Sequence, residues 1–103
     1  MEKLFVYGTL REPKIQRRVI GHKIKGELCV LEGYKKIDIK IFADDFPIII
    51  KKRNHFVEGI LLNVNKKELG LIDLYESRIY KRKMVKTEKG RAWAYIPTKL
   101  SRN

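Results

Sequence analysis

Two short segments contain residues whose types and positions could support chemistry. Residues 4–12 read LFVYGTLRE, in which an apolar run ends abruptly at Gly8. Residues 71–77 read LIDLYES, in which Glu76 lies near the end of a predicted helix. Because glycine has no Cβ, backbone N–H groups beside Gly8 could approach an anionic ligand closely. A carboxylate such as that of Glu76 could act as a general acid or base.

Each of these segments also has an ordinary structural interpretation. The first could be a strand that ends in a glycine turn and binds nothing. Glu76 could form an ion pair on the surface with Arg78 or Arg82. A carboxylate near the C-terminal end of a helix opposes the helix dipole, but the cost is only about 0.3–1 kcal/mol. Taken by themselves, the residues favour the structural interpretation and leave the catalytic one open.

Other kinds of catalytic or binding site find little support in the sequence. His22 and His55 are far apart and have no partner at a metal-ligand spacing. The single cysteine, Cys29, lies in an apolar, strand-like context, which indicates a buried structural thiol. Neither a P-loop nor a GxGxxG motif occurs. The two serines, Ser77 and Ser101, are in no nucleophile-elbow context.

The elements that must position Gly8 and Glu76 can be predicted from periodicity and turn residues. Residues 4–7 form an apolar strand, and Pro13 suits the first turn of a helix over 13–20 that Gly21 closes. Asn65 is a predicted N-cap, and Glu68 completes the spacing of a capping box before a helix over 66–75. Further strands are predicted over 23–30, 37–41, 47–50, 56–64, 79–87 and 92–96.

Turn residues and side-chain alternation give further expectations for these strands. In the strand over 23–30, we expect one face to carry Ile24, Gly26, Leu28 and Val30. Breaks or turns are expected at Gly33, Asp44–Asp45, Arg53–Asn54 and Lys89–Gly90. The order β-α-β-β-β-β-α-β-β favours an α+β fold, a small mixed and mainly antiparallel β-barrel with two short helices. We expect one domain over residues 1–97 and a polar tail over 98–103.

Composition and charge set the class of protein. The chain has 103 residues, 44% of them hydrophobic, and a formal net charge of +12, which indicates a folded, strongly basic domain. Its apolar runs are too short to span a membrane, and the N-terminus has no signal-peptide pattern, so we expect a cytoplasmic protein. The excess of lysine and arginine could attract nucleic acid. Because these residues are spread along the whole chain, a solvated surface is the favoured explanation.

Read together, the two segments resemble the paired signatures of the gamma-glutamylcyclotransferase-like family. Members of that family open with a strand ending in YGTL or YGSL, to which Tyr7–Leu10 is similar. They later carry a helix ending in L-D-x-[YF]-E-G and then Y-x-R, to which residues 72–76, Tyr80 and Arg82 are similar. Three connecting strands also agree, those with Phe46–Ile49, Val57–Leu61 and Ala94–Ile96. The short length resembles the compact branch that includes gamma-glutamylamine cyclotransferase.

The resemblance implies a reaction and a place for it. In this family the free α-amino group of a γ-glutamyl compound attacks its own γ-carbonyl, which releases 5-oxoproline and an amine or amino acid. No cofactor or metal takes part. By position, Glu76 corresponds to the family's essential glutamate, the general acid/base. The loop that holds the glutamyl portion corresponds to the backbone of Tyr7, Gly8, Thr9 and Leu10.

The resemblance is weaker for other residues. Tyr80 could orient the glutamate or the substrate, and Arg82 could bind a carboxylate, although a structural ion pair explains Arg82 equally well. Ser77 stands where the family usually has glycine, and Leu62 replaces a frequent tyrosine. Strong basicity is not typical of the family, which is consistent with a substrate that carries additional negative charge.

Two functional hypotheses follow from the sequence. The favoured one is a cofactor-independent enzyme acting on a small γ-glutamyl amine or γ-glutamyl amino acid. The alternative is a basic module that binds RNA or another polyanion on a non-catalytic version of the same fold. The enzyme is favoured because both Glu76 and the YGTL segment remain, whereas a retired site would be free to lose them. The identity of the leaving amine stays open at this point.

Overall fold

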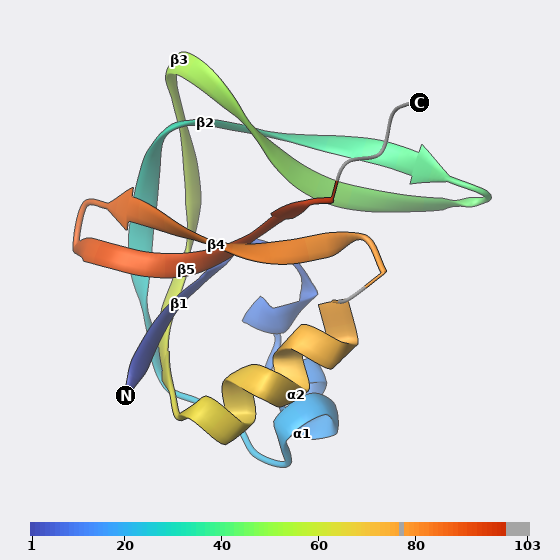
Figure 1. Ribbon diagram of the computed structural model, residues 1–103, viewed down its shortest axis with the longest axis vertical. Coiled ribbons are helices and arrows are strands. Elements are labelled where there is room, and N and C mark those ends of the chain that lie inside the picture. The colour runs from blue at the N-terminus through green and yellow to red at the C-terminus, as the bar shows by residue number, and fades with distance from the viewer. Residues whose placement is uncertain (77, 99–103) are drawn as a thin grey trace.

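The computed structural model describes residues 1–76 and 78–98, whose strands form one mixed sheet (Figure 1). The elements are β1 (Glu2–Val6), the 3-10 helix η1 (Thr9–Arg11), α1 (Pro13–Ile20), β2 (Gly26–Ile41), β3 (Asp44–Val64), α2 (Lys66–Glu76), β4 (Tyr80–Thr87) and β5 (Gly90–Pro97). The strand order is β2-β3-β1-β5-β4, in which β1 pairs antiparallel with β3 and parallel with β5. The α+β class is confirmed.

The predicted barrel is not formed, because the sheet stays open with β2 and β4 at its edges. The two edges approach each other near the turn between β4 and β5. There the Val30 N–H donates a hydrogen bond to the Glu88 carboxylate at 3.0 Å. The Glu88 N–H in turn donates to the Val30 carbonyl oxygen at 3.1 Å. The two edges are therefore linked by two hydrogen bonds of one residue, one through the Glu88 side chain and one through its backbone, and not by the ladder of strand hydrogen bonds that would close a barrel.

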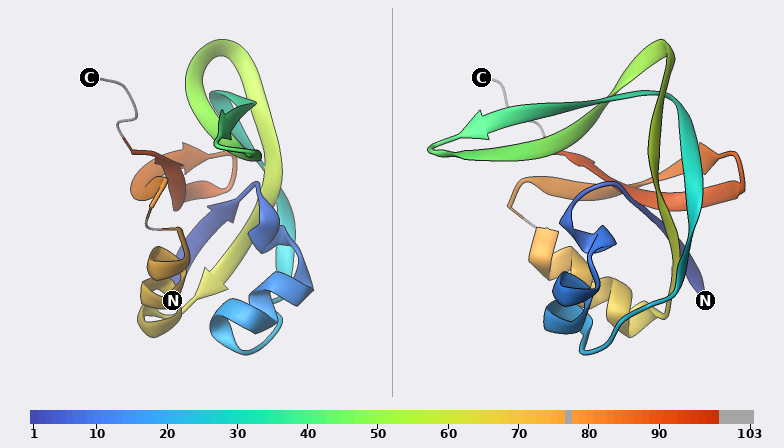
Figure 2. Two further views of the ribbon diagram at one scale, coloured as in Figure 1. Left: turned by 90° about the vertical axis from the view of Figure 1, so that its right-hand side faces the viewer. Right: turned by 180° about the vertical axis from the view of Figure 1, so that it is seen from behind.

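The longest strands, β2 and β3, pass through positions where breaks were predicted. Gly33 (φ 83°) and Asn54 (φ 63°) both have left-handed backbone conformations. The strand register shifts between Glu32 and Tyr34, so the ladder is interrupted by a bulge and then resumes. The predicted breaks at Gly33 and Arg53–Asn54 are thus wrong, because a bulge bends a strand without ending it. The outer half of this hairpin, residues 34–51, bends away and is called the arm below (Figures 1 and 2).

Two further details of the β2–β3 hairpin differ from the expectations. Its turn lies at Phe42–Ala43, and Asp44–Asp45 instead begin β3. The predicted face of the strand over 23–30 is inverted, because Leu28 is 81% exposed whereas Cys29 is buried. The buried thiol predicted for Cys29 is confirmed.

The core has two parts, one on each face of the central strand β1. Leu4 and Val6 pack on the face that carries both helices, together with Leu69 and Ile72 of α2. Phe5 packs on the opposite face, within a cluster of β2, β3, β4 and β5 side chains. A strand covered on both faces needs an uninterrupted apolar run, which explains the sequence LFVY before Gly8.

Both predicted ends of α1 and the predicted start of α2 are confirmed, whereas α2 ends at Glu76, one residue later than predicted. Pro13 begins α1, and Gly21, in a left-handed conformation with φ 88°, ends it. The Asn65 side-chain oxygen accepts a hydrogen bond from the Glu68 N–H at 2.7 Å, and the Asn65 N–H donates to the Glu68 carboxylate at 2.9 Å. This reciprocal pair is a capping box, so the start of α2 is confirmed. Within the described residues, no helix is long and apolar enough to cross a membrane.

Some predictions concern residues outside the described ranges. The polar tail predicted over 98–103 is described only at Thr98. Ser77, the departure from the family's glycine after the glutamate, also lies outside the described residues.

Candidate active site

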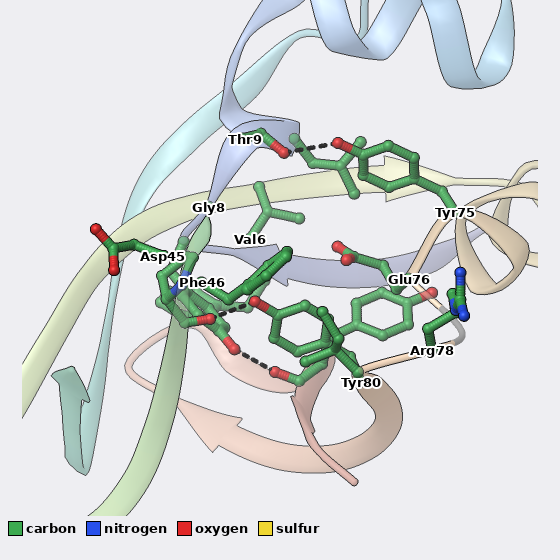
Figure 3. A pocket seen from close by; sticks show the side chains of 15 residues that line it. Val6, Gly8, Thr9, Asp45, Phe46, Tyr75, Glu76, Arg78 and Tyr80 are labelled. Carbon is green, nitrogen blue, oxygen red and sulfur yellow. Dashed lines mark hydrogen bonds between the residues drawn. The ribbon is translucent and has the colours of Figure 1, made fainter. Parts of the chain in front are cut away.

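A cavity of about 410 Å³ opens between the C-terminal end of β1 and the C-terminal end of α2 (Figure 3). Gly8 and Glu76 both line it, although 68 positions separate them in sequence. The arm of β3 contributes a third wall through Asp45, Phe46 and Pro47. The structure therefore brings residues of the segments 4–12 and 71–77 together at one cavity.

The loop at Gly8 is held on its outer side by two cationic side chains. The Lys36 ammonium group, on the arm of β2, donates a hydrogen bond to the Tyr7 carbonyl oxygen at 3.0 Å. The Arg11 guanidinium donates to the Gly8 carbonyl oxygen at 3.0 Å, and the Arg11 N–H donates to the same oxygen at 3.1 Å. These contacts fix the orientation of the peptide groups that follow β1.

The space beside Gly8 would accommodate a Cβ atom. A Cβ built on Gly8 would come no closer than 3.5 Å to a heavy atom outside its own chain neighbours, the Pro47 Cγ. That separation is an ordinary van der Waals contact, and the Gly8 φ of −117° lies outside the left-handed region that favours glycine. Packing within the described protein therefore does not require glycine at position 8. The open space beside this backbone belongs to the cavity.

Glu76 is the last residue of α2, and Figure 3 shows its carboxylate pointing into the cavity. Burial raises the pKa of the Glu76 carboxyl group to about 7, because a low-dielectric environment disfavours the charged form. Among the described residues, the carboxylate has neither an ion pair nor a hydrogen-bond donor. The surface ion pair with Arg78 or Arg82 that the sequence left open is therefore absent from the described structure.

A partly buried polar network fixes α2 one turn before Glu76. The Asp73 carboxylate accepts hydrogen bonds from the Tyr95 hydroxyl at 2.6 Å and from the Arg82 Nε at 2.7 Å. Tyr95, on β5, is only 4% exposed, and its carbonyl oxygen accepts a hydrogen bond from the Tyr7 hydroxyl. The strand that leads to Gly8 and the helix that ends at Glu76 are thus tied to the same residue of β5.

Arg82 has a structural position. Its guanidinium pairs with Asp73 and lies over the Trp93 ring, 4.4 Å from the ring centroid. Arg82 is also not among the described residues that line the cavity. Of the two interpretations left open by the sequence, the structural ion pair is the one that this geometry favours.

Tyr80 and Leu10 both line the cavity, but each is engaged with the protein. The Tyr80 hydroxyl donates a hydrogen bond to the Pro47 carbonyl oxygen. Burial first, and then the negative charge of Glu76, raises the pKa of Tyr80 to about 12, so this side chain stays neutral near pH 7. The Leu10 side chain is buried in the core beneath α1 and α2, and its carbonyl oxygen accepts a hydrogen bond from the Gln16 Nε2 at 2.8 Å.

The two segments also touch directly across the cavity. The hydroxyl groups of Thr9 and Tyr75 are 2.9 Å apart (Figure 3). Thr9 follows Gly8, and Tyr75 precedes Glu76, so this hydrogen bond links the immediate neighbours of the two central residues. Burial is the main cause that raises the pKa of Tyr7, whose hydroxyl donates to the Tyr95 carbonyl oxygen on β5.

Several residues of the site were not singled out from the sequence. Tyr75 lies within residues 71–77 and Arg78 follows that segment directly, and both line the cavity. Lys36 and Asp45 come from the arm of β2 and β3, and only tertiary structure brings them to the loop. Their surroundings in sequence are those of ordinary strand and turn residues. No group of three or more potential metal ligands occurs among the described residues.

Comparisons with known proteins agree with the resemblance seen in the sequence. A sequence model of the family described as gamma-glutamyl cyclotransferase, AIG2-like, matches residues 4–103. No curated protein sequence gives a significant match. A solution structure from Arabidopsis thaliana superposes with a TM-score of 0.82 at 23% identity, over 93% of this chain and 61% of that protein. The chain thus spans about three fifths of the length of that relative.

Two other solved structures have the same fold. An uncharacterized protein from Pyrococcus horikoshii has a TM-score of 0.73 at 20% identity, over 99% of this chain and 82% of that one. A protein named gamma-glutamyl cyclotransferase has a TM-score of 0.74 at 17% identity, over 94% of this chain and 66% of that one. Identities this low establish the fold alone, whereas the family match extends over nearly the whole sequence. The chain belongs to the gamma-glutamyl cyclotransferase, AIG2-like family.

Proposed function

We propose that the protein is a cyclotransferase that converts a γ-glutamyl amine or γ-glutamyl amino acid to 5-oxoproline and the free amine. Glu76 is the general acid/base, and the backbone of Tyr7–Leu10 holds the glutamyl portion. The observation that carries this proposal is the position of Glu76, whose partly buried carboxylate points into the cavity that Gly8 also lines.

The reaction needs only proton transfer and a constrained substrate. The Glu76 carboxylate takes a proton from the substrate's α-ammonium group, and the freed amine attacks the γ-carbonyl carbon. The bond from that carbon to the leaving nitrogen breaks as Glu76 returns the proton to that nitrogen. The ring nitrogen gives up its second proton to the released amine, which leaves as an ammonium ion. The new C–N bond closes the 5-oxoproline ring, and no water or cofactor is consumed. A pKa of about 7 suits a group that must both accept and donate a proton near neutral pH.

Two physical effects account for the expected rate enhancement. Nucleophile and electrophile belong to one molecule, and holding it in the cyclising conformation can contribute roughly 7–11 kcal/mol. Acid–base service by one carboxylate typically contributes about 10²–10⁴-fold. The held loop at Gly8 supports the first effect, and the buried carboxylate supports the second. Backbone N–H groups near Gly8 would also stabilise the oxygen that becomes negatively charged during attack.

The proposal can be tested by incubating the purified protein with a panel of γ-glutamyl amines and γ-glutamyl amino acids and measuring 5-oxoproline. We expect product from at least one compound and a loss of about 100-fold or more in Glu76→Gln. Glu58→Gln is the matched control, because Glu58 is an exposed β3 residue outside the cavity. Absence of product from every compound, or full activity in Glu76→Gln, would contradict the proposal.

The alternative of a polyanion-binding module assigns no role to Glu76. It predicts retention on nucleic acid that weakens steeply with salt and is unchanged by Glu76→Gln. Such retention without any 5-oxoproline would favour that alternative.

A further inference from the structure

Arg78 is a cation that lines the same cavity as Glu76. We propose that it binds a carboxylate on the leaving group, so that the substrate is a γ-glutamyl amino acid in preference to a γ-glutamyl amine. This inference rests on the proposed function, because it concerns the other end of the same substrate.

The charges that line the cavity single out Arg78. Among the described residues, those that line it with charged side chains are Asp45, Glu76 and Arg78. Asp45 is already paired with Lys40, at 3.3 Å between carboxylate oxygen and ammonium nitrogen. Glu76 is assigned to proton transfer. Among the described residues, the Arg78 guanidinium has no ion-pair partner, and an exposed cation at a cavity edge is free to meet an anionic ligand.

Arg78 also leaves the catalytic carboxylate unpaired. The pKa of Glu76 is raised by burial, whereas a guanidinium in contact with the carboxylate would hold it down. The arginine thus shares the cavity with Glu76 without neutralising it. A second role for this cation, separate from the proton chemistry, is therefore available.

The geometry of the substrate directs the leaving group toward Arg78. The α-amino and α-carboxylate groups of the glutamyl portion are attached to one carbon, and both stay with the part held at the loop. The leaving nitrogen is bonded to the γ-carbon, so its substituent must extend away from that part. Figure 3 shows Gly8 on one side of the Glu76 carboxylate and Arg78 on the other. A leaving amino acid would bring its carboxylate to the guanidinium, and a simple amine would leave the guanidinium unpaired.

The overall charge of the protein acts in the same direction. A net charge of +12 attracts anions. A γ-glutamyl amino acid carries one more negative charge than the corresponding γ-glutamyl amine. The long-range field and the local guanidinium therefore favour the same class of substrate.

The test compares γ-glutamylalanine with γ-glutamylethylamide, which differ only by the leaving-side carboxylate. The ratio of their kcat/KM values is measured from 5-oxoproline release by wild type, Arg78→Gln, Arg78→Lys and Arg18→Gln. We expect Arg78→Gln to lower the preference for γ-glutamylalanine about tenfold, as for loss of a charge-assisted hydrogen bond at an exposed site. Arg78→Lys should keep part of the preference, because it keeps the charge. Arg18→Gln removes one exposed α1 charge and should leave the ratio unchanged.

Two results overturn this inference while leaving the proposed function intact. One is a ratio that Arg78→Gln does not change. The other is an equal loss for both compounds, which would assign Arg78 to the glutamyl carboxylate that they share. Absence of 5-oxoproline from both compounds with the wild-type protein would instead overturn the proposed function, and this inference with it.

Discussion

Replacing Glu76 with glutamine should stabilise the fold at alkaline pH, even though it should remove the proposed activity. Burial raises the pKa of Glu76 from 4.5 to about 7 in the folded protein, whereas the unfolded chain keeps the ordinary value. Below pH 4.5 the group is protonated in both states and does not oppose folding. As the pH rises through 7, the folded protein must hold a buried charge that the unfolded chain exposes to water, so stability is lost.

The size of this effect follows from the pKa difference. A shift of about 2.5 units at 1.36 kcal/mol per unit gives roughly 3 kcal/mol. Glutamine at this position carries no charge, so Glu76→Gln should be more stable than wild type by up to that amount above pH 8. The difference should shrink between pH 7 and pH 4.5, where the wild-type carboxyl group becomes protonated.

Urea unfolding of wild type, Glu76→Gln and the control Glu58→Gln between pH 4 and 9 measures this difference directly. Titration of all other groups is common to the proteins and cancels when two of them are compared at the same pH. The reasoning is refuted if the stability difference between Glu76→Gln and wild type does not change with pH. It is equally refuted if wild type is the more stable protein above pH 8.

Three further substitutions separate folding from the proposed chemistry. Gly59→Ala would place a Cβ 2.5 Å from the Val6 carbonyl oxygen, so urea unfolding should show a free energy of unfolding lower by about 1–3 kcal/mol. Wild-type stability would contradict the packing described for β3 against β1. Gly8→Ala meets no such clash, so its free energy of unfolding should match wild type within about 0.5 kcal/mol. Its 5-oxoproline release should fall, because the added methyl group occupies ligand space. Unchanged kinetics would argue against the proposed role of the loop in holding the substrate. Tyr95→Phe removes the hydroxyl bonded to Asp73 and should cost about 1–3 kcal/mol of unfolding free energy, and a neutral result would show that the network does not hold α2.

The parts of the fold that could be predicted are those fixed by local chemistry. Pro13 and Gly21 determine the ends of α1, and the capping box of Asn65 and Glu68 determines the start of α2. Each of these signals depends on residues within a few positions of one another, so the sequence is sufficient.

The long-range features could not be read in the same way. A glycine such as Gly33 ends a strand in a turn or bends it in a bulge, and only the partner strand decides which. The inverted face around Leu28 has the same origin, because alternation does not say which set of side chains meets the core. Closure of a barrel depends on contacts between β2 and β4, which are distant in sequence.

The candidate site shows the same division. Gly8 and Glu76 could be proposed from the sequence because each lies in a motif that resembles a family signature. Lys36 reaches the loop from the arm of β2, and nothing in its surrounding sequence distinguishes it from other surface lysines. Arg82 was left with two roles because its partner, Asp73, and its aromatic neighbour, Trp93, meet it only in the folded protein.

The pH dependence of kcat/KM for 5-oxoproline formation tests most directly whether the buried Glu76 carboxylate performs the proton transfer. We expect kcat/KM to rise about tenfold per pH unit below pH 7 and then to level toward a plateau, because only the ionised carboxylate can accept the ammonium proton. The residual rate of Glu76→Gln should lack this inflection near pH 7. A wild-type profile without an inflection between pH 5.5 and 8, or the same inflection in Glu76→Gln, would contradict the account.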